Sequence, residues 1–187
     1  MKVEDVWAMG PAEWRALLRD GHPIDPDALA GWSYRGTSLG MPAIVDRVTW
    51  KTFQKCFHRD DAGVMRGWNV RLVQDGTTQR GAPSEPQRDR RGEPVTFGHF
   101  RVVPARDRGV PHGFDRGLLL DYGGLSARAI GPLSRLRDPI VALRAGDADL
   151  LLGWSYLAAL GRTIDTPSFF TLEREARTAH VPLTCTR

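Results

Sequence analysis

The fold of this chain is decided by the stretch from Asp138 to Arg174, which reads DPIVALRAGDADLLLGWSYLAALGRTIDTPSFFTLER. It contains three apolar runs separated by turn-forming residues, with Gly146 and Asp147 in the first break and Gly161 in the second. Runs of about seven to ten residues rich in Ile, Val, Leu, Trp, Tyr and Phe are typical of strands and short for helices. The pattern therefore predicts an antiparallel meander of three strands.

Alternating apolar and polar residues predict strands in the rest of the chain. Trp32 and Tyr34 project to one face of a strand that begins near residue 30. Half-buried strands are predicted over 64–73 and 95–103, and a buried strand over Leu118–Leu120 that ends at a turn. The chain is therefore rich in strands throughout.

Two helices are expected beside these strands. A short one is predicted within residues 1–20, with Pro11 in its first turn. A medium helix is predicted over Pro42–His58, because apolar residues recur there at steps of three and four. Lys51 and Lys55 would then face solvent.

We predict that the whole chain, 1–187, folds as one mainly β domain, an antiparallel β-barrel. A length of 187 residues suits a single substantial core. Closing the sheet removes its exposed edges, and about eight strands leave room inside for one small ligand. A sandwich of two sheets is the competing architecture, because periodicity alone does not separate the two. Residues 74–94 have little to bury, so we expect a mobile loop there.

Charge and composition argue against nucleic-acid and membrane partners. The net charge is +4 and the pI about 9.5, yet the basic-looking segment 79–94 sets four arginines against three acids, a net of +1. No apolar run approaches the roughly 20 residues of a membrane helix, and the N-terminus is acidic where a signal peptide is basic. We therefore expect a cytoplasmic protein that binds neither nucleic acid nor a membrane.

No sequence motif for a nucleotide, a metal or a catalytic nucleophile is present. Cys56 and Cys185 have no metal-ligand spacing, and neither have the histidines, so we expect no metal, no cofactor and no disulfide in a reducing compartment. His99 lies in the middle of a predicted strand. There a hydrogen-bonded core role is favoured over a general base or a haem or metal ligand.

Two acidic residues near strand ends are candidates for chemistry. Asp121 suits an Asx-type turn better than a buried acid with a raised pKa. If the chain is an enzyme, Asp121 and His99 are its acid/base candidates and Tyr122 is a donor. Asp138 follows Arg137, and an exposed ion pair is favoured there over a ligand-contacting pair.

Strand aromatics are candidates for a ligand site. Trp68, Trp154 and Tyr156 suit plain core packing, but on a shared interior face they would line an apolar pocket with polar tips. The ligand-binding residues that we predict are Trp68, His99, Tyr122, Trp154 and Tyr156.

Three pieces of the sequence, AGWSYRG at 30–36, VTWKTF at 48–53 and the stretch 136–174, resemble a known group. They are similar to bacterial and fungal proteins described as GXWXG and DUF4334 domains, which are in turn similar to the calycins, the lipocalin-like superfamily. Residues 64–117 match no motif. The chain also departs from the Gly-x-Trp-x-Gly pattern, since Tyr34 stands where the pattern has Trp.

The resemblance implies a lipocalin-like barrel around an internal cavity. It also implies that an aromatic residue of the first strand closes one end, with a basic residue of the last strand packed over it. Here these residues would be Trp32 or Tyr34 and Arg174. We expect them to act as a structural latch, with an Arg and aromatic contact of about 0.5–2 kcal/mol.

Three functions remain open at this point. The favoured one is binding of a small hydrophobic molecule inside the barrel, without chemistry of its own. The second is an isomerase or cyclase that holds a flexible substrate in a reactive conformation. The third is a structural or protein-interaction module whose interior is filled by side chains, and a cavity well under about 300 Å³ would favour it.

Overall fold

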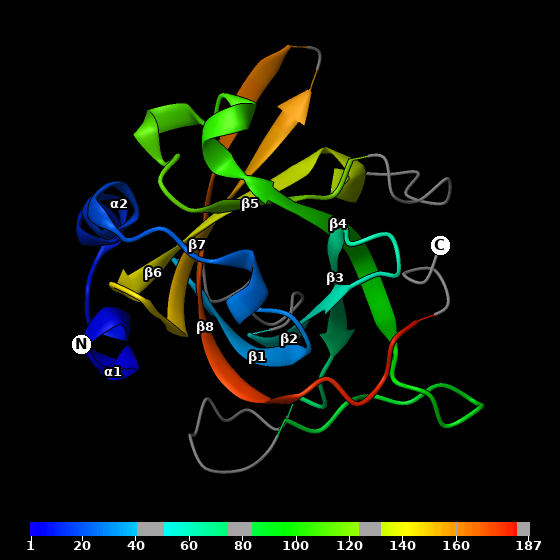
Figure 1. Cartoon of the computed structure of the whole chain (residues 1–187). Helices are drawn as coiled ribbons and strands as arrows, with labels where there is room; N and C mark the ends of the chain where they lie inside the picture. The colour runs from blue at the N-terminus through cyan, green and yellow to red at the C-terminus, as the bar shows by residue number, and fades with distance from the viewer. Residues whose placement is uncertain (41–50, 75–83, 124–131, 160, 183–187) are drawn as a thin grey trace.

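The computed structural model describes residues 1–40, 51–74, 84–123, 132–159 and 161–182. Within them, eight antiparallel strands form a closed barrel, in which each strand pairs with the next and the last pairs with the first. Figure 1 views this ring of strands roughly along the barrel axis. The predicted antiparallel barrel is therefore confirmed, and the sandwich is excluded.

The strands follow one another around the barrel in chain order. They are β1 (Trp32–Leu39), β2 (Thr52–Arg59), β3 (Met65–Arg71), β4 (Thr96–Pro104), β5 (Leu118–Asp121), β6 (Leu136–Arg144), β7 (Asp147–Ala159) and β8 (Arg162–Arg177). The meander predicted from Asp138 to Arg174 is confirmed as β6, β7 and β8. Its last strand closes the ring, because Leu39 pairs with Phe169 and Trp32 with Arg177.

The predicted medium helix is wrong where the structure describes it. Thr52–Arg59 is strand β2, paired with β1 on one side and β3 on the other. Residues 42–50 lie outside the described part of the chain. A short apolar run fits both a period of 3.6 and a period of 2, and here two flanking strands satisfy its backbone hydrogen bonds.

The N-terminal helices cover the outer face of the meander. Helices α1 (Val3–Trp7) and α2 (Pro11–Asp20) lie against β6, β7 and β8. The α2 helix begins after Gly10, whose N–H donates to the Glu13 carboxylate at 2.8 Å. Trp14 and Leu18 bury one side of α2 in an outer apolar cluster that also contains Trp154. The short N-terminal helix was predicted, but the chain forms two.

One end of the barrel is closed by the residues that lead into β1. The short 3₁₀ helix η1 (Pro26–Ala28) lies between Ile24 and Leu29, which pack into the interior apolar cluster. Gly31 N–H donates to Phe57 O at 2.9 Å, which joins this segment to the end of β2. We call this the latched end, and Figure 1 looks into the barrel from this side.

Further short helices and connections complete the described chain. They are η2 (Ala105–Arg108), η3 (Pro111–Gly113) and η4 (Pro132–Arg135). In the predicted loop 74–94, residues 75–83 lie outside the description, while Gln87 N–H donates to Arg71 O and Val73 N–H to Glu85 O, each at 2.8 Å. The mobility of this loop stays a prediction. Among the described helices, none has the length and apolarity needed to cross a membrane.

Candidate functional site

Three glycine and phenylalanine pairs shape the barrel interior. Each phenylalanine ring lies over the glycine directly opposite it on the neighbouring strand, and a Cβ on that glycine would overlap the ring. The pairs are Gly36 with Phe53, Gly67 with Phe100, and Gly153 with Phe170. Because these glycines have no side chain, three rings lie flat against the wall and converge on one point.

That point is the amine of Lys55. Its Nζ lies 5.2–5.3 Å from the ring centroids of Phe53, Phe100, Tyr122 and Phe170. Lys55 is only 3% exposed. The alternation of β2 places it inside, between Phe53 and Phe57, and the expectation that it faces solvent is wrong.

Hydrogen bonds satisfy all three N–H groups of the Lys55 ammonium. Nζ donates to Tyr122 Oη at 2.6 Å, to Asn69 Oδ1 at 2.9 Å and to Asp138 Oδ2 at 3.2 Å. The Asn69 amide is itself oriented, since its Nδ2 donates to Gly98 O at 3.0 Å. A buried ammonium needs such partners, because an unpaired buried charge is strongly destabilising.

Asp138 neutralises this charge from the opposite wall. The carboxylate is 1% exposed and accepts from Tyr122 Oη at 2.9 Å and from Ser155 Oγ at 2.8 Å, in addition to Lys55. We call the five side chains the polar cluster. They are Lys55 of β2, Asn69 of β3, Tyr122 after β5, Asp138 of β6 and Ser155 of β7.

Burial dominates the proton affinities in the polar cluster. It lowers the pKa of Lys55 below its usual value, and the nearby Asp138 carboxylate raises it back only in part. Burial, and then the Asp138 charge, raise the pKa of Tyr122 well above 10. The amine is therefore easier to deprotonate than an ordinary lysine, while the phenol keeps its proton.

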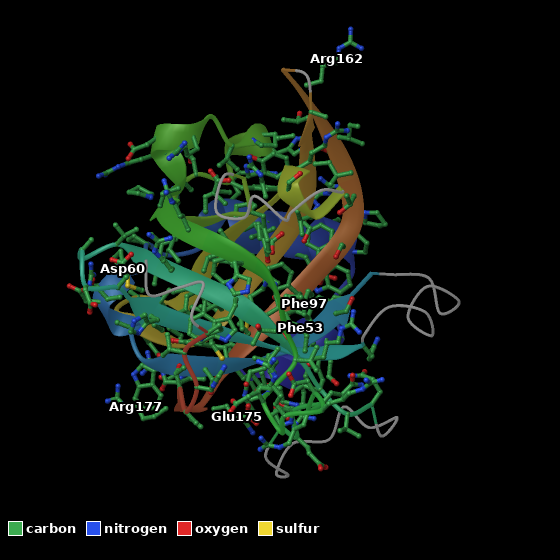
Figure 2. The ribbon with its side chains drawn as sticks, turned by 90° about the vertical axis from the view of Figure 1, so that its right-hand side faces the viewer. Phe53, Asp60, Phe97, Arg162, Glu175 and Arg177 are labelled. Atoms are coloured by element: carbon green, nitrogen blue, oxygen red, sulfur yellow. The ribbon has the colours of Figure 1, made fainter. Side chains whose placement is uncertain are left out.

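A cavity of about 140 Å³ opens beside the polar cluster. Its lining combines aromatic and apolar groups with polar ones: Ser38, Phe53, Lys55, Asn69, Phe97, Tyr122, Leu136, Asp138, Ser155, Ser168 and Phe170. These residues lie towards the end of the barrel where β1, β3, β5 and β7 finish, opposite the latched end. We call it the cavity end. In Figure 2, Phe53 and Phe97 lie close together, away from Asp60 and Arg177 of the latched end.

A bulge in β4 brings Phe97 to this cavity. The register between β3 and β4 shifts between Gly67 and Asn69, and Gly98 has a φ of +52°. Such a bulge redirects side chains at the rim of a barrel. A Cβ at Gly98 would crowd Asn69 and Tyr122, so this glycine also makes room for the polar cluster.

A second cavity, of about 320 Å³, lies on the outer wall. Asp121, Tyr156 and Arg137 contribute to its lining, and Arg137 Nε lies 3.0 Å from Asp121 Oδ1. The Asp121 and Arg137 side chains are 13% and 19% exposed. This cavity is larger, but it lies outside the barrel, and Asp121 in its lining is shared by Arg137 and by Arg108, whose Nη1 lies 4.0 Å from Asp121 Oδ2.

Of the five predicted ligand-binding residues, Tyr122 lines the interior cavity. Trp154 and Tyr156 face outwards, because Ser155 between them and Gly153 before them face inwards, and both belong to the outer cluster that α2 covers. Trp68 faces outwards opposite Cys56 and packs with Val181. The expectation that these three aromatics share an interior face is therefore wrong. Period-two alternation shows which residues share a face, but not which face is inside.

The predicted acid/base pair does not meet in the interior either. Asp121 is directly before Tyr122 and so lies on the outer wall, where its Oδ1 accepts from Gly123 N–H at 2.8 Å. This is the Asx-type turn that the sequence favoured. His99 precedes the inward-facing Phe100 and is half-buried on the outside, where burial lowers its pKa. Neither lines the interior cavity, so a mechanism with Asp121 and His99 inside the barrel is wrong.

Sequence reasoning missed Lys55 and misplaced Asp138. Asp138 is not an exposed partner of Arg137, since Arg137 pairs with Asp121 and Asp138 with Lys55. Two signals were available. Lys55 stands between Phe53 and Phe57 at steps of two, and Asp138 shares the face of Ile140. A charge on an apolar strand face is a candidate buried partner.

The predicted latch residues lie together at the latched end. The Arg174 guanidinium lies 4.9 Å from the Trp32 ring centroid and donates to Tyr34 Oη at 3.2 Å and to Ala28 O at 3.0 Å. Arg174 Nη1 also lies 2.9 Å from Asp149 Oδ1. The contact expected from the resemblance is thus present, and its contribution to stability is a prediction given below.

The polar cluster offers an amine, a phenol and a carboxylate within hydrogen-bonding distance of one another, beside an aromatic cavity. Such groups can bind a polar atom of a ligand and move a proton between Lys55 and Asp138. Across the described residues, no three His, Cys, Asp or Glu side chains gather where they could hold a metal ion. Comparison of the sequence with models of known protein families and with curated proteins finds no match.

Proposed function

We propose that the barrel binds a small, largely apolar molecule in its interior cavity, with the polar cluster orienting one polar atom of the ligand. The observation that carries the proposal is the position of the polar cluster at the wall of a cavity whose apolar lining comes from Phe53, Phe97, Leu136 and Phe170. Small-molecule sites combine an apolar lining with a few convergent polar groups in this way.

The energetics of the buried ion pair also support binding of a ligand. A buried ion pair with its desolvation penalty is often no more stabilising than well-packed apolar residues of similar volume. Lys55 and Asp138 are therefore better explained by a role towards a ligand than by stability alone. The expected kinship with calycins supports the same function, since barrels of about eight strands can hold one small ligand.

The cavity volume limits the size of the ligand. About 140 Å³ is below the roughly 300–1,000 Å³ of sites for drug-sized molecules. An engineered protein cavity of about 150 Å³ accepts benzene. A molecule with a single ring is therefore the expected ligand.

The small volume also favours a second candidate, a barrel filled by its own side chains that serves a structural role. A thermal-shift screen of single-ring alcohols, phenols and aldehydes separates the two. A ligand at a hundred times its dissociation constant adds about 2.7 kcal/mol of stability. Binding is supported if the melting temperature rises for some of these compounds, and the filled barrel if none has an effect.

Two filling variants locate the binding site. Ser38→Leu reduces the interior cavity, and Ala159→Leu reduces the outer one, since each residue lines only the cavity named. We expect Ser38→Leu to abolish the ligand-induced shift and Ala159→Leu to leave it unchanged. The reverse result would assign binding to the outer wall and contradict the proposal.

A further inference from the structure

We propose that the ligand is a small aldehyde or ketone and that Lys55 captures it as a Schiff base. This inference rests on the proposed function, because the carbonyl compound must first enter the interior cavity. It adds the chemical class of the ligand and a covalent step.

The first support is the choice of a lysine at this position. Lysine occurs in this chain only at positions 2, 51 and 55. The rest of its 26 Lys and Arg residues are arginines. An arginine could supply a buried positive charge and stacks well on aromatic rings, but it cannot act as an amine nucleophile. The chain therefore places a group that can lose its proton at the one point where three phenylalanine rings converge.

The second support is the proton acceptor beside the amine. Asp138 Oδ2 lies 3.2 Å from Lys55 Nζ, and Tyr122 Oη lies 2.6 Å from Nζ and 2.9 Å from Asp138 Oδ2. The three groups form a closed triangle through which a proton can pass in either direction. Burial also lowers the pKa of Lys55, and a desolvated lysine amine is the usual nucleophile towards carbonyl compounds.

The reaction balances within this triangle. Lys55 first gives a proton to Asp138, and the neutral amine attacks the carbonyl carbon. The new C–N bond forms as the C=O π pair moves to oxygen, which takes the proton back from Asp138 through Tyr122. A second proton passes from nitrogen to the hydroxyl by the same route, and water leaves. The product is a protonated imine, whose positive charge remains paired with the Asp138 carboxylate.

The surrounding rings suit both the ligand and the adduct. Phe53, Phe97 and Phe170 line the cavity and offer apolar surface to the body of the carbonyl compound. Because Lys55 is only 3% exposed, bulk water, which would hydrolyse the imine, has little access to it.

The test uses the intact wild-type protein with benzaldehyde, a single-ring probe of the expected size, and cyanoborohydride to trap imines at neutral pH. Labelled sites are mapped by peptide mass spectrometry. We expect labelling at Lys55 to be faster than at Lys51, because the aromatic cavity holds the aldehyde beside the Lys55 amine. Benzyl alcohol, which lacks the carbonyl group, should compete with the labelling of Lys55 and leave that of Lys2 and Lys51 unchanged.

Variants check the assignment. Lys51→Arg is the matched control and should leave labelling at Lys55 intact. The paired change Lys55→Met with Asp138→Asn removes both charges together and should abolish interior labelling, while Lys2 and Lys51 are still labelled. Labelling confined to Lys2, Lys51 and the N-terminus, with benzyl alcohol still bound, would overturn the covalent capture alone. If neither compound binds nor labels the interior, the proposed function fails as well.

Discussion

At the latched end of the barrel, Arg174 lies over the Trp32 ring and its side chain is 23% exposed, while at the cavity end Lys55 lies among four rings and its side chain is 4% exposed. Both are basic side chains that point along the interior and contact aromatic rings and tyrosine hydroxyls. The guanidinium reaches the rim, where water still solvates it. The amine does not, and it requires the Asp138 carboxylate as a partner.

The two ends differ in how much hydration a basic side chain loses when the barrel folds. A charge at the rim keeps part of its hydration, so its contacts add stability without a large desolvation penalty. A charge in the interior depends on a complete set of partners, and removal of one partner leaves the other uncompensated. The latched end therefore closes the barrel with a partly hydrated cation, whereas the cavity end holds a cation that depends on its buried partners.

Of the substitutions that compare the two ends, Lys55→Met should cause the largest loss of stability. This change leaves Asp138 buried without its cation and should lower the free energy of unfolding by about 3–5 kcal/mol. Arg174→Met, the same change at the latched end, should have a smaller effect. Urea denaturation measures both, and an equal or smaller loss for Lys55→Met would contradict the proposed difference between the ends.

A double variant tests whether the uncompensated charge causes this loss of stability. Lys55→Met combined with Asp138→Asn should recover most of the lost stability, because no uncompensated charge remains. If the pair variant is as unstable as the single one, packing rather than charge explains the loss.

The next effect concerns the glycines that let the rings converge on Lys55. A Cβ at Gly153 would overlap the Phe170 ring, so Gly153→Ala should lower stability by about 1–3 kcal/mol through strain in the core. Combining it with Phe170→Leu should recover part of the loss, since the smaller side chain leaves room for the methyl group. Additive losses in the double variant would show that the two positions do not compete for space.

An effect of similar size is expected from Arg174→Ala. The change removes the contact with Trp32 and the hydrogen bonds to Tyr34 and Ala28, and should lower the free energy of unfolding by about 2 kcal/mol. Ligand binding at the cavity end should be unchanged. Arg177→Ala is the control, because Arg177 also lies over Trp32 but is exposed. A loss of ligand binding in Arg174→Ala alone would show that the two ends are coupled.

The smallest effect is a dependence on alkaline pH. The pKa of Tyr122 is raised well above 10 in the folded barrel, so above pH 10 the unfolded chain loses this proton while the folded protein keeps it. The unfolded state then binds fewer protons, and stability falls as pH rises, by at most about 1.4 kcal/mol per pH unit. Tyr122→Phe should show a shallower fall between pH 10 and 11 in denaturation curves. Equal slopes would indicate that the Tyr122 hydroxyl is not shielded as the geometry implies.

Much of the fold could be predicted from the sequence, but of the polar cluster only Tyr122 was predicted as a site residue. Alternation placed the strands that became β1, β3, β4 and the meander, since local patterns report which side chains share a face. The segment of β2 was misread as a helix, because a short apolar run carries both periods. Because of that error Lys55 was expected to face solvent and was not considered as a site residue.

The sequence also did not show which face of each strand lies inside the barrel. Trp154 and Tyr156 are both buried, but they are buried in the outer apolar cluster rather than inside the barrel. A strand of this barrel has apolar neighbours on both sides wherever a helix covers it, so burial alone does not identify the interior.

The sequence by itself determined an antiparallel, strand-rich chain with a meander over 138–174, because hydrophobic alternation and turn residues act locally. Only the tertiary structure decided the interior. It brought Lys55, Asn69, Tyr122, Asp138 and Ser155 together from across the barrel wall, although Lys55 and Asp138 are 83 residues apart in the chain. The curvature and register of a closed sheet decide which strands face each other across its centre, and no local sequence pattern encodes this arrangement.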